Sequence, residues 1–165
     1  MIGKPLRSWQ IAHEAMKRGG GGNMSEQERG GYVVQESDYP WQELSEPELR
    51  ARSSIRWKTL LGEGGTPTSK VTFGLAEIPV GGTWVLHHHA PPEVYYILAG
   101  EGTTEIDGVV HDICAGSVIY IPGNAQHLTV NTGAEPLRFA YAFPTDTIEE
   151  IEYHFADHAA GPSRL

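Results

Sequence analysis

From about residue 55 onward the sequence consists of short apolar runs that turn-forming residues interrupt at close intervals. Asp107-Gly108, Pro122-Gly123-Asn124 and Thr132-Gly133 are such interruptions, and the chain has 20 Gly and 11 Pro among its 165 residues. These dipeptides favour tight turns because Gly and Asn adopt the positive φ that hairpin turns require. No long stretch with helical periodicity separates the runs. The pattern therefore predicts an all-β fold, an antiparallel sandwich or barrel.

The apolar runs predict a series of short strands. We expect strands at residues 57–61, 70–79, 83–89, 93–99, 102–106, 109–114, 117–121, 126–131 and 137–143. A further edge strand is expected at 32–35, and Ser45 followed by Glu48 predicts the capped start of a short helix. The tail at 146–153 fits both a helical face and strand alternation, so its structure stays open.

The length and the Gly distribution divide the chain into two parts. At 165 residues it is expected to form one domain, which we place at 32–165. Residues 1–31 differ in character: a weakly amphipathic stretch at 6–18 is followed by four glycines, as in a flexible or helical N-terminal arm. The segment is either a loosely attached arm or an extension of the start site, since Met24 could itself begin the domain. Alternatively, the arm packs on a partner subunit.

Composition excludes several classes of partner. The net charge is −9 and there is no basic cluster, so no nucleic acid is expected to bind. No apolar run approaches the roughly 18 residues of a membrane span, and the N-terminus has no apolar signal core. We therefore expect a cytoplasmic protein without membrane attachment. Cys114 is the only cysteine, which excludes an intramolecular disulfide, and we expect a buried, inert thiol.

Four side chains are candidates for one metal site. His87 and His89 share a strand face because side chains alternate with a period of two. Ala90-Pro91-Pro92 must end that strand, so Glu93 opens the next one within reach of the same face. A barrel can bring His127 from a later strand to this point. Three imidazoles and one carboxylate suit a single divalent Fe, Mn, Ni, Co or Zn ion, with open positions for a substrate.

The spacing of these residues resembles the two motifs of the cupin superfamily. Residues 81–100 read Gly-x5-His-x-His-x3-Glu-x6-Gly, and residues 116–131 read Gly-x5-Pro-x4-His-x3-Asn. One position departs from the family pattern: the glycine two places after the proline is Asn124, which tolerates the same left-handed backbone. The resemblance implies a single cupin-type antiparallel β-barrel, also called a double-stranded β-helix or jelly roll, and a homodimer.

Within the cupins the chain resembles the small bacterial lyases that cleave dimethylsulfoniopropionate. The segments that carry this resemblance are RWKTL at 56–60, FGLAEIPVGG at 73–82, HHHAPPEVYY at 87–96, YIPGNAQH at 120–127, FPTD at 143–146 and IEEIEYHF at 148–155. It implies a carbon–sulfur lyase in which Tyr95, two residues after the metal-binding Glu93, acts as the base. It also implies that Tyr153 lines the substrate pocket.

The substrate of such a lyase is a small carboxylate that also carries a sulfonium. Base-catalysed β-elimination would yield acrylate and dimethyl sulfide, and metal binding at the carboxylate would assist removal of the α-proton. A sulfonium binds aromatic faces, as other onium groups do. The aromatic candidates for substrate binding are Trp57, Trp84, Tyr120, Tyr141, Phe143 and Tyr153.

Other functions fit the same ligands. A mononuclear iron dioxygenase or a sugar or keto-acid isomerase would use the same metal site. A non-catalytic, ligand-binding cupin is a further alternative, although the chain shows no helix-turn-helix segment typical of a transcriptional sensor.

Overall fold

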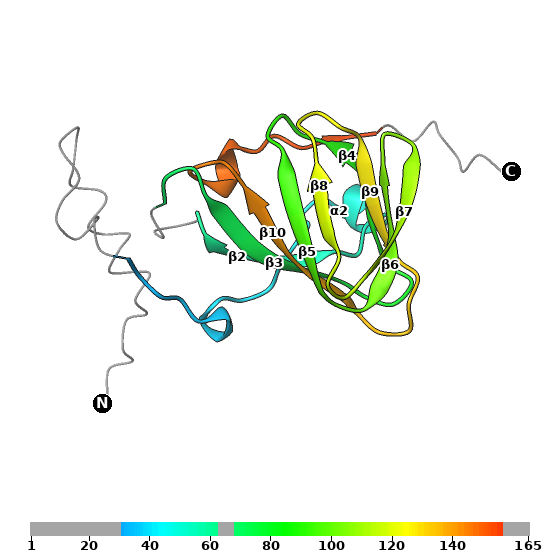
Figure 1. The fold of residues 1–165 in the computed structure, drawn as a ribbon, viewed down its shortest axis with the longest axis horizontal. Helices are drawn as coiled ribbons and strands as arrows, with labels where there is room; N and C mark the ends of the chain where they lie inside the picture. The colour runs from blue at the N-terminus through cyan, green and yellow to red at the C-terminus, as the bar shows by residue number, and fades with distance from the viewer. Residues whose placement is uncertain (1–30, 63–67, 157–165) are drawn as a thin grey trace, which may run out of the picture.

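The computed structural model describes residues 31–62 and 68–156, and these form two facing antiparallel sheets (Figure 1). In spatial order the first sheet contains β1 (Gln42–Glu43), β2 (Arg56–Leu61), β3 (Thr72–Ile78), β10 (Leu137–Phe143), β5 (Glu93–Ala99) and β8 (Val118–Ile121). The second contains β11 (His154–Phe155), β4 (Thr83–His88), β9 (His127–Asn131), β6 (Glu101–Ile106) and β7 (Val109–Cys114). The all-β prediction is confirmed, while the predicted arm lies outside the described residues except for Gly31.

Alternation along the strands separates an inner from an outer face. In β5, Glu93, Tyr95 and Ile97 are buried, whereas Val94 and Tyr96 are exposed. Strand β9 repeats this alternation, with its buried positions occupied by His127, Thr129 and Asn131. The inner faces of the two sheets enclose an apolar core whose most buried side chains are Ile78, Ile97, Ile121, Leu137 and Phe139. This alternation places the candidate metal ligands and Tyr95 inside the barrel.

Each expected strand from residue 57 to 143 is observed, with ends that differ by at most a few residues. Residues 32–35, however, are not a strand, because the sheet begins only at β1. The short helix α2 (Pro47–Arg50) exists, but the predicted Ser45 cap is wrong: Glu46 is the N-cap residue, and the Ser45 hydroxyl donates to its carboxylate instead. Proline at the first helical position starts the helix there.

The C-terminal tail combines both structures that its sequence allows. A 3₁₀ turn, η3 (Ile148–Glu150), is followed by β11, which pairs with β4. His154 lies opposite His88, and their rings stack with centroids 4.9 Å apart. Phe155 lies opposite His87, so the tail reaches the candidate metal ligands.

The prediction of a buried Cys114 is wrong, because its side chain is exposed. Strand β7 lies at the edge of its sheet, and within it only Ile113 is buried. Cys114 is one position further along and therefore points outward.

The outer face of the first sheet is only partly covered. The chain before β1, which includes the 3₁₀ turn η2 (Glu36–Asp38), packs Val34 and Tyr39 against Leu60, Leu75 and Ala140. Glu36 fastens this segment through ion pairs with Lys58 and Arg138. Further along the same face, the outer side chains of β5 and β8 remain exposed. Within the described residues, no helix is long and apolar enough to cross a membrane.

Candidate metal centre and its cavity

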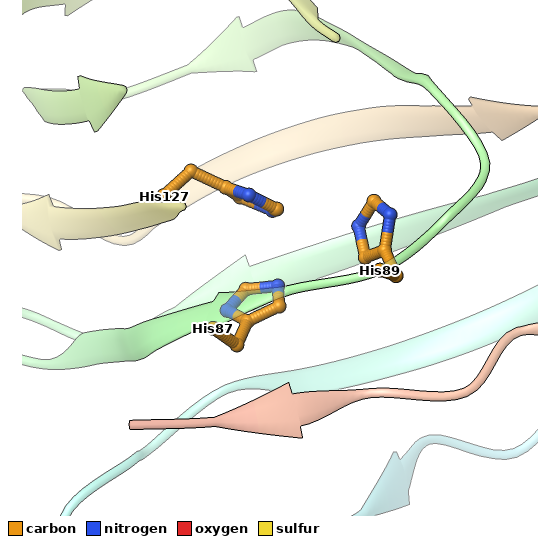
Figure 2. Close-up of side chains that lie close together, drawn as sticks. All are labelled: His87, His89 and His127. Atoms are coloured by element: carbon orange, nitrogen blue, oxygen red, sulfur yellow. The ribbon is translucent and has the colours of Figure 1, made fainter. Parts of the chain in front are cut away.

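His87, His89 and His127 converge inside the barrel (Figure 2). His87 lies in β4, His89 follows that strand directly, and His127 begins β9. The ligand atoms of the three imidazoles all lie within 4.8 Å of one another, and no ring is more than 1% exposed. Their register explains the contact, since β4 and β9 pair with His87 opposite His127.

The main chain orients each imidazole through its Nδ1 atom. His87 Nδ1 lies 2.7 Å from the Val85 carbonyl oxygen, and His127 Nδ1 lies 2.9 Å from that of Ala125. His89 Nδ1 lies 2.8 Å from the carbonyl oxygen of Pro91. A carbonyl oxygen only accepts, so each Nδ1 carries a proton, and in the neutral form of each ring Nε2 keeps its lone pair. All three rings therefore present a metal-binding nitrogen to the interior.

The donor set fits a divalent transition metal. The Nε2 atoms of His87 and His127 are buried and have no hydrogen-bond partner, a costly arrangement for polar atoms unless a further ligand binds them. A Glu93 carboxylate oxygen lies 3.2 Å from His89 Nε2 and 3.6 Å from His127 Nε2. Three neutral imidazoles and one carboxylate are ligands that bind Zn, Fe, Ni, Co or Mn.

The pKa values of two of these imidazoles move in opposite directions. Burial, followed by the neighbouring His127, lowers the pKa of His87 well below 6.5. Burial also acts to lower the pKa of His89, but its hydrogen bond to Glu93 and the charge of that carboxylate outweigh burial, so the net pKa is raised. His87 is therefore neutral at neutral pH, while the Glu93 contact favours the protonated form of His89.

The turn at residues 122–124 holds the ligand segment in place. The amide of Asn124 donates to the His89 carbonyl at 2.8 Å, and Asn124 has a φ of 64°. A Cβ atom at Gly123 would lie 2.3 Å from the Ala90 carbonyl oxygen, so only glycine allows this approach. Asn124 thus adopts the left-handed backbone expected for the position where it replaces the motif glycine.

A cavity of about 650 Å³ opens beside the metal-ligand cluster. Glu93 is the one candidate metal ligand that lines the cavity, and Tyr95, Tyr141 and Tyr153 line it as well. The cavity extends from there to α2, where the exposed Glu46 and Glu48 line it. The tyrosines and Glu93 thus form a polar inner end behind an opening at the surface.

The structure brings most of the predicted pocket aromatics together. Trp57, Trp84, Tyr141 and Tyr153 line the cavity, and the Tyr153 ring lies 5.4 Å from that of His89 between centroids. Phe143 is not in the lining, but its ring packs 5.0 Å from His89. Phe143 therefore packs against the imidazole of His89 without lining the cavity.

Tyr120 does not reach the cavity, and its prediction as a pocket residue is corrected. It is 63% exposed and lies opposite Val94 on the outer face of the first sheet. Residues directly opposite in a sheet share a face, and the neighbouring Ile119 and Ile121 occupy the inner one. Because a turn follows at Pro122, the sequence alone did not determine which side chains of β8 face inward.

Burial and the nearby Glu93 favour the neutral phenols of Tyr95 and Tyr153. Burial, followed by the charge of Glu93, raises the pKa of each well above 10.0. A side-chain hydrogen bond with Glu93 adds to the effect for Tyr95. A base at either position therefore needs an additional positive charge nearby.

The comparison with known families settles the class of the chain. Residues 74–143 match the family model of the cupin domain. The chain is also 45% identical to the dimethylsulfoniopropionate lyase DddW of Ruegeria pomeroyi over 105 residues, which cover 64% of this chain and 68% of the relative.

The chain is a cupin. It is also 30% identical to the oxalate-binding protein of Thermotoga maritima over 111 residues, covering 66% of this cupin and 90% of that protein. Among solved structures, the polyketide cyclase RemF of Streptomyces resistomycificus superposes with a TM-score of 0.65 at 17% identity, over 79% of this chain and 88% of RemF. At that identity the likeness supports the fold alone.

Sequence patterns missed part of the cavity of this cupin. The cavity is also lined by Leu44, which precedes α2, by Leu49 within α2 and by Phe155 in β11. The alternation of Tyr153 with Phe155 was a signal that both face the same side. Arg52 is the single Lys or Arg in the described lining, and its guanidinium donates to the Ala156 carbonyl at 3.4 Å. Nothing in the local sequence indicated that the α2 segment would fold over the open end.

Proposed function

We propose that this cupin is a metal-dependent lyase that cleaves dimethylsulfoniopropionate into acrylate and dimethyl sulfide. The observation that carries the proposal is the 45% identity to DddW, combined with a convergent histidine cluster beside a tyrosine-lined cavity. General fold similarity would not suffice, because cupin-type barrels support many reactions.

His87, His89, Glu93 and His127 would hold one divalent transition metal. The two unpartnered Nε2 atoms and the fixed Nδ1 protons support this assignment. When bound, such a metal supplies Lewis acidity toward a substrate carboxylate and a positive charge that favours the phenolate of Tyr95.

Tyr95 is the proposed base. Its side chain is 1% exposed, shares the inner face of β5 with Glu93 and lines the cavity. Its phenolate oxygen would take the proton from the carbon next to the carboxylate. The electron pair of that C–H bond then forms the double bond of acrylate, and the C–S bond breaks with its pair on sulfur. A phenol held out of water and beside the reacting carbon suits this transfer.

The aromatic walls would bind the sulfonium. Trp57, Trp84, Tyr141 and Tyr153 line the cavity, and the rings of Trp84 and Tyr153 lie 6.0 Å apart between centroids. Ring faces attract onium groups without requiring a full negative charge. Phe143 would act on this arrangement only through its packing against His89.

The direct test is headspace detection of dimethyl sulfide after dimethylsulfoniopropionate is added to protein reconstituted with Mn, Fe, Ni, Co or Zn. We expect dimethyl sulfide and acrylate in equal amounts, both with and without oxygen, because the elimination consumes no oxidant. Absence of both products with every metal would overturn the proposal. Oxygen consumption with another carboxylate would favour a dioxygenase instead.

A second candidate is a cupin that binds a small carboxylate without turnover. The likeness to the oxalate-binding protein of Thermotoga maritima favours it. Calorimetric binding of oxalate to metal-loaded protein that releases no product from dimethylsulfoniopropionate would support this alternative over the lyase.

We further propose that two copies pair through the exposed apolar side chains of the first sheet. This β5–β8 face consists of Val94, Tyr96, Leu98, Val118 and Tyr120. It carries no charged side chain, whereas the chain has a net charge of −9, so two copies repel least where these faces meet. A homodimer in the cytoplasm is the assembly that we expect.

A further inference from the structure

The cavity is much larger than the substrate of the proposed reaction requires. Its volume of about 650 Å³ lies within the roughly 300–1,000 Å³ typical of pockets for drug-sized ligands. Dimethylsulfoniopropionate has only a propionate chain and two methyl groups on sulfur. Much of the cavity would therefore stay unfilled when this molecule binds at the inner end.

The unfilled part has apolar walls. Leu44, Leu49, Ile55 and Ile148 line the cavity, with Leu49 in α2 and Ile148 in η3, and we name this group the outer chamber. Leu44, Leu49 and Ile55 are buried members of the main core cluster, while Ile148 is partly exposed and packs against it. Such walls gain free energy by contact with alkyl groups and offer a small polar zwitterion little.

A carboxylate bound at the inner end of the cavity would direct the leaving group toward the outer chamber. If the carboxylate occupies the inner end near Glu93 and Tyr95, sulfur and its alkyl groups point away from them along the cavity. Trp57 and Trp84 line the same cavity, and the carboxylates of Glu46 and Glu48 lie at the α2 side. Aromatic faces and negative charge suit a sulfonium, and the outer chamber suits the chains attached to it.

We propose that this enzyme accepts β-sulfoniopropionates whose sulfur carries larger alkyl groups than methyl. This inference rests on the proposed lyase function and assigns the outer chamber to the leaving group. The reaction is the same elimination: Tyr95 takes the α-proton, the carbon–carbon double bond of acrylate forms, and the dialkyl sulfide leaves with the electron pair of the broken C–S bond.

The test compares dimethyl-, diethyl- and dipropyl-sulfoniopropionate on metal-loaded protein by the release of acrylate, the product common to all three. We expect kcat/KM to stay level or to rise along the series, by at most about fourfold for each methylene that becomes buried. A fall of tenfold or more from dimethyl to diethyl would overturn the inference and leave the lyase function intact. No acrylate from any substrate would overturn both.

A variant locates the effect. Ile148→Trp fills the outer chamber from a partly exposed position, so the fold should tolerate the larger side chain. We expect at least a tenfold loss of kcat/KM for the dipropyl substrate and less than threefold for the dimethyl one. Val109→Trp, at an exposed position of β7 in the other sheet, is the matched control and should change neither. Equal losses for both substrates in Ile148→Trp would contradict the assignment.

Binding provides a readout that is independent of turnover. Calorimetry on metal-loaded Tyr95→Phe, in which turnover is slow, should give a Kd that tightens from dimethyl to dipropyl, and this trend should disappear when Ile148→Trp is added. A Kd that weakens along the series in Tyr95→Phe alone would also overturn the inference.

Discussion

At the scale of single residues, the orientation of the metal ligands depends on the backbone. Each Nδ1–H of the three histidines donates to a carbonyl oxygen two residues away in the chain. Those carbonyls belong to Val85, Pro91 and Ala125 and cannot rotate freely as side chains do. The interior nitrogens are consequently set before any ligand binds, which lowers the ordering cost of binding.

Removal of one ligand should empty the site. In His127→Ala, we expect bound metal to fall well below one ion per chain after dialysis, measured by atomic absorption, because the remaining donors leave one side open. His111→Ala is the control, since His111 lies on the exposed face of β7. Wild-type metal content in His127→Ala would contradict a four-ligand site.

Loss of the phenol should separate chemistry from metal binding. Tyr95→Phe keeps the ring that packs against Phe139 at a centroid distance of 4.5 Å, so the fold should persist. We expect kcat to fall by about 10² to 10⁴, the range typical of a lost general base, with metal content unchanged. Tyr120→Phe, which lies outside the cavity, should retain full activity. Full turnover by Tyr95→Phe would remove Tyr95 from the mechanism.

Metal affinity should weaken in acid. The pKa of His89 is raised above 6.5, so at pH values below this raised pKa a proton must leave the ring before a metal binds. As pH falls through that raised pKa, the proton competes increasingly and affinity drops. His87, whose pKa lies well below 6.5, adds its own competition only at lower pH. Competitive titration with a chelator from pH 8 to pH 5 measures the slope, and an affinity independent of pH would contradict the raised pKa of His89.

At the scale of elements, the site depends on two turns that pack against each other. The turn at residues 122–124 hydrogen-bonds to His89 and approaches Ala90 too closely for any side chain at Gly123. The ligand segment after β4 and the entry to β9 are therefore held together away from the metal ligands themselves. This contact links the two sequence motifs in space.

A substitution at Asn124 tests that contact. Asn124→Val should lower the free energy of unfolding by about 1–2 kcal/mol, because a β-branched residue resists the φ of 64° at this position. Asn124→Gly should be neutral or slightly stabilising. Chemical denaturation of both variants measures the difference, and equal stability of the two would show that backbone strain at the turn is unimportant.

Much of this arrangement could be predicted from the sequence. The two-residue period placed His87, His89, Glu93 and Tyr95 on inner faces, and turn residues located the strand ends. Cys114 and Tyr120 were misjudged because their burial depends on which face of a strand turns inward, and a neighbouring turn can change that phase. Strand β11 and the cover formed by α2 depend on contacts with distant segments, which local periodicity does not report.

At the scale of the whole molecule, the outer face of the first sheet is covered over one half and exposed over the other. Val34 and Tyr39 cover the part over β2, β3 and β10, whereas the side chains of the β5–β8 face are 38–69% exposed. Strand β8 is also the edge of that sheet, so its outward backbone groups have no neighbouring strand among the described residues. Both features favour pairing with an identical face across a twofold axis.

Light scattering coupled to size-exclusion chromatography tests this pairing. We expect the mass of a dimer for the wild type and of a monomer for Val118→Glu, because the new charge would meet its own copy across the axis. Val109→Glu, on β7 in the other sheet, should remain a dimer. A wild-type monomer at micromolar concentration would contradict the proposed assembly.

Along strand β5, consecutive residues alternate between the interior of the barrel and the outer surface of the sheet. Glu93 and Tyr95 face the cavity and Ile97 faces the core, while Val94, Tyr96 and Leu98 form the outside of the sheet. Substitutions at odd positions therefore alter the reaction site, and those at even positions alter the surface, so each set can diverge in evolution while the other stays fixed. Loss of one codon within the strand would exchange the two sets, turning the phenol outward and an apolar surface into the cavity.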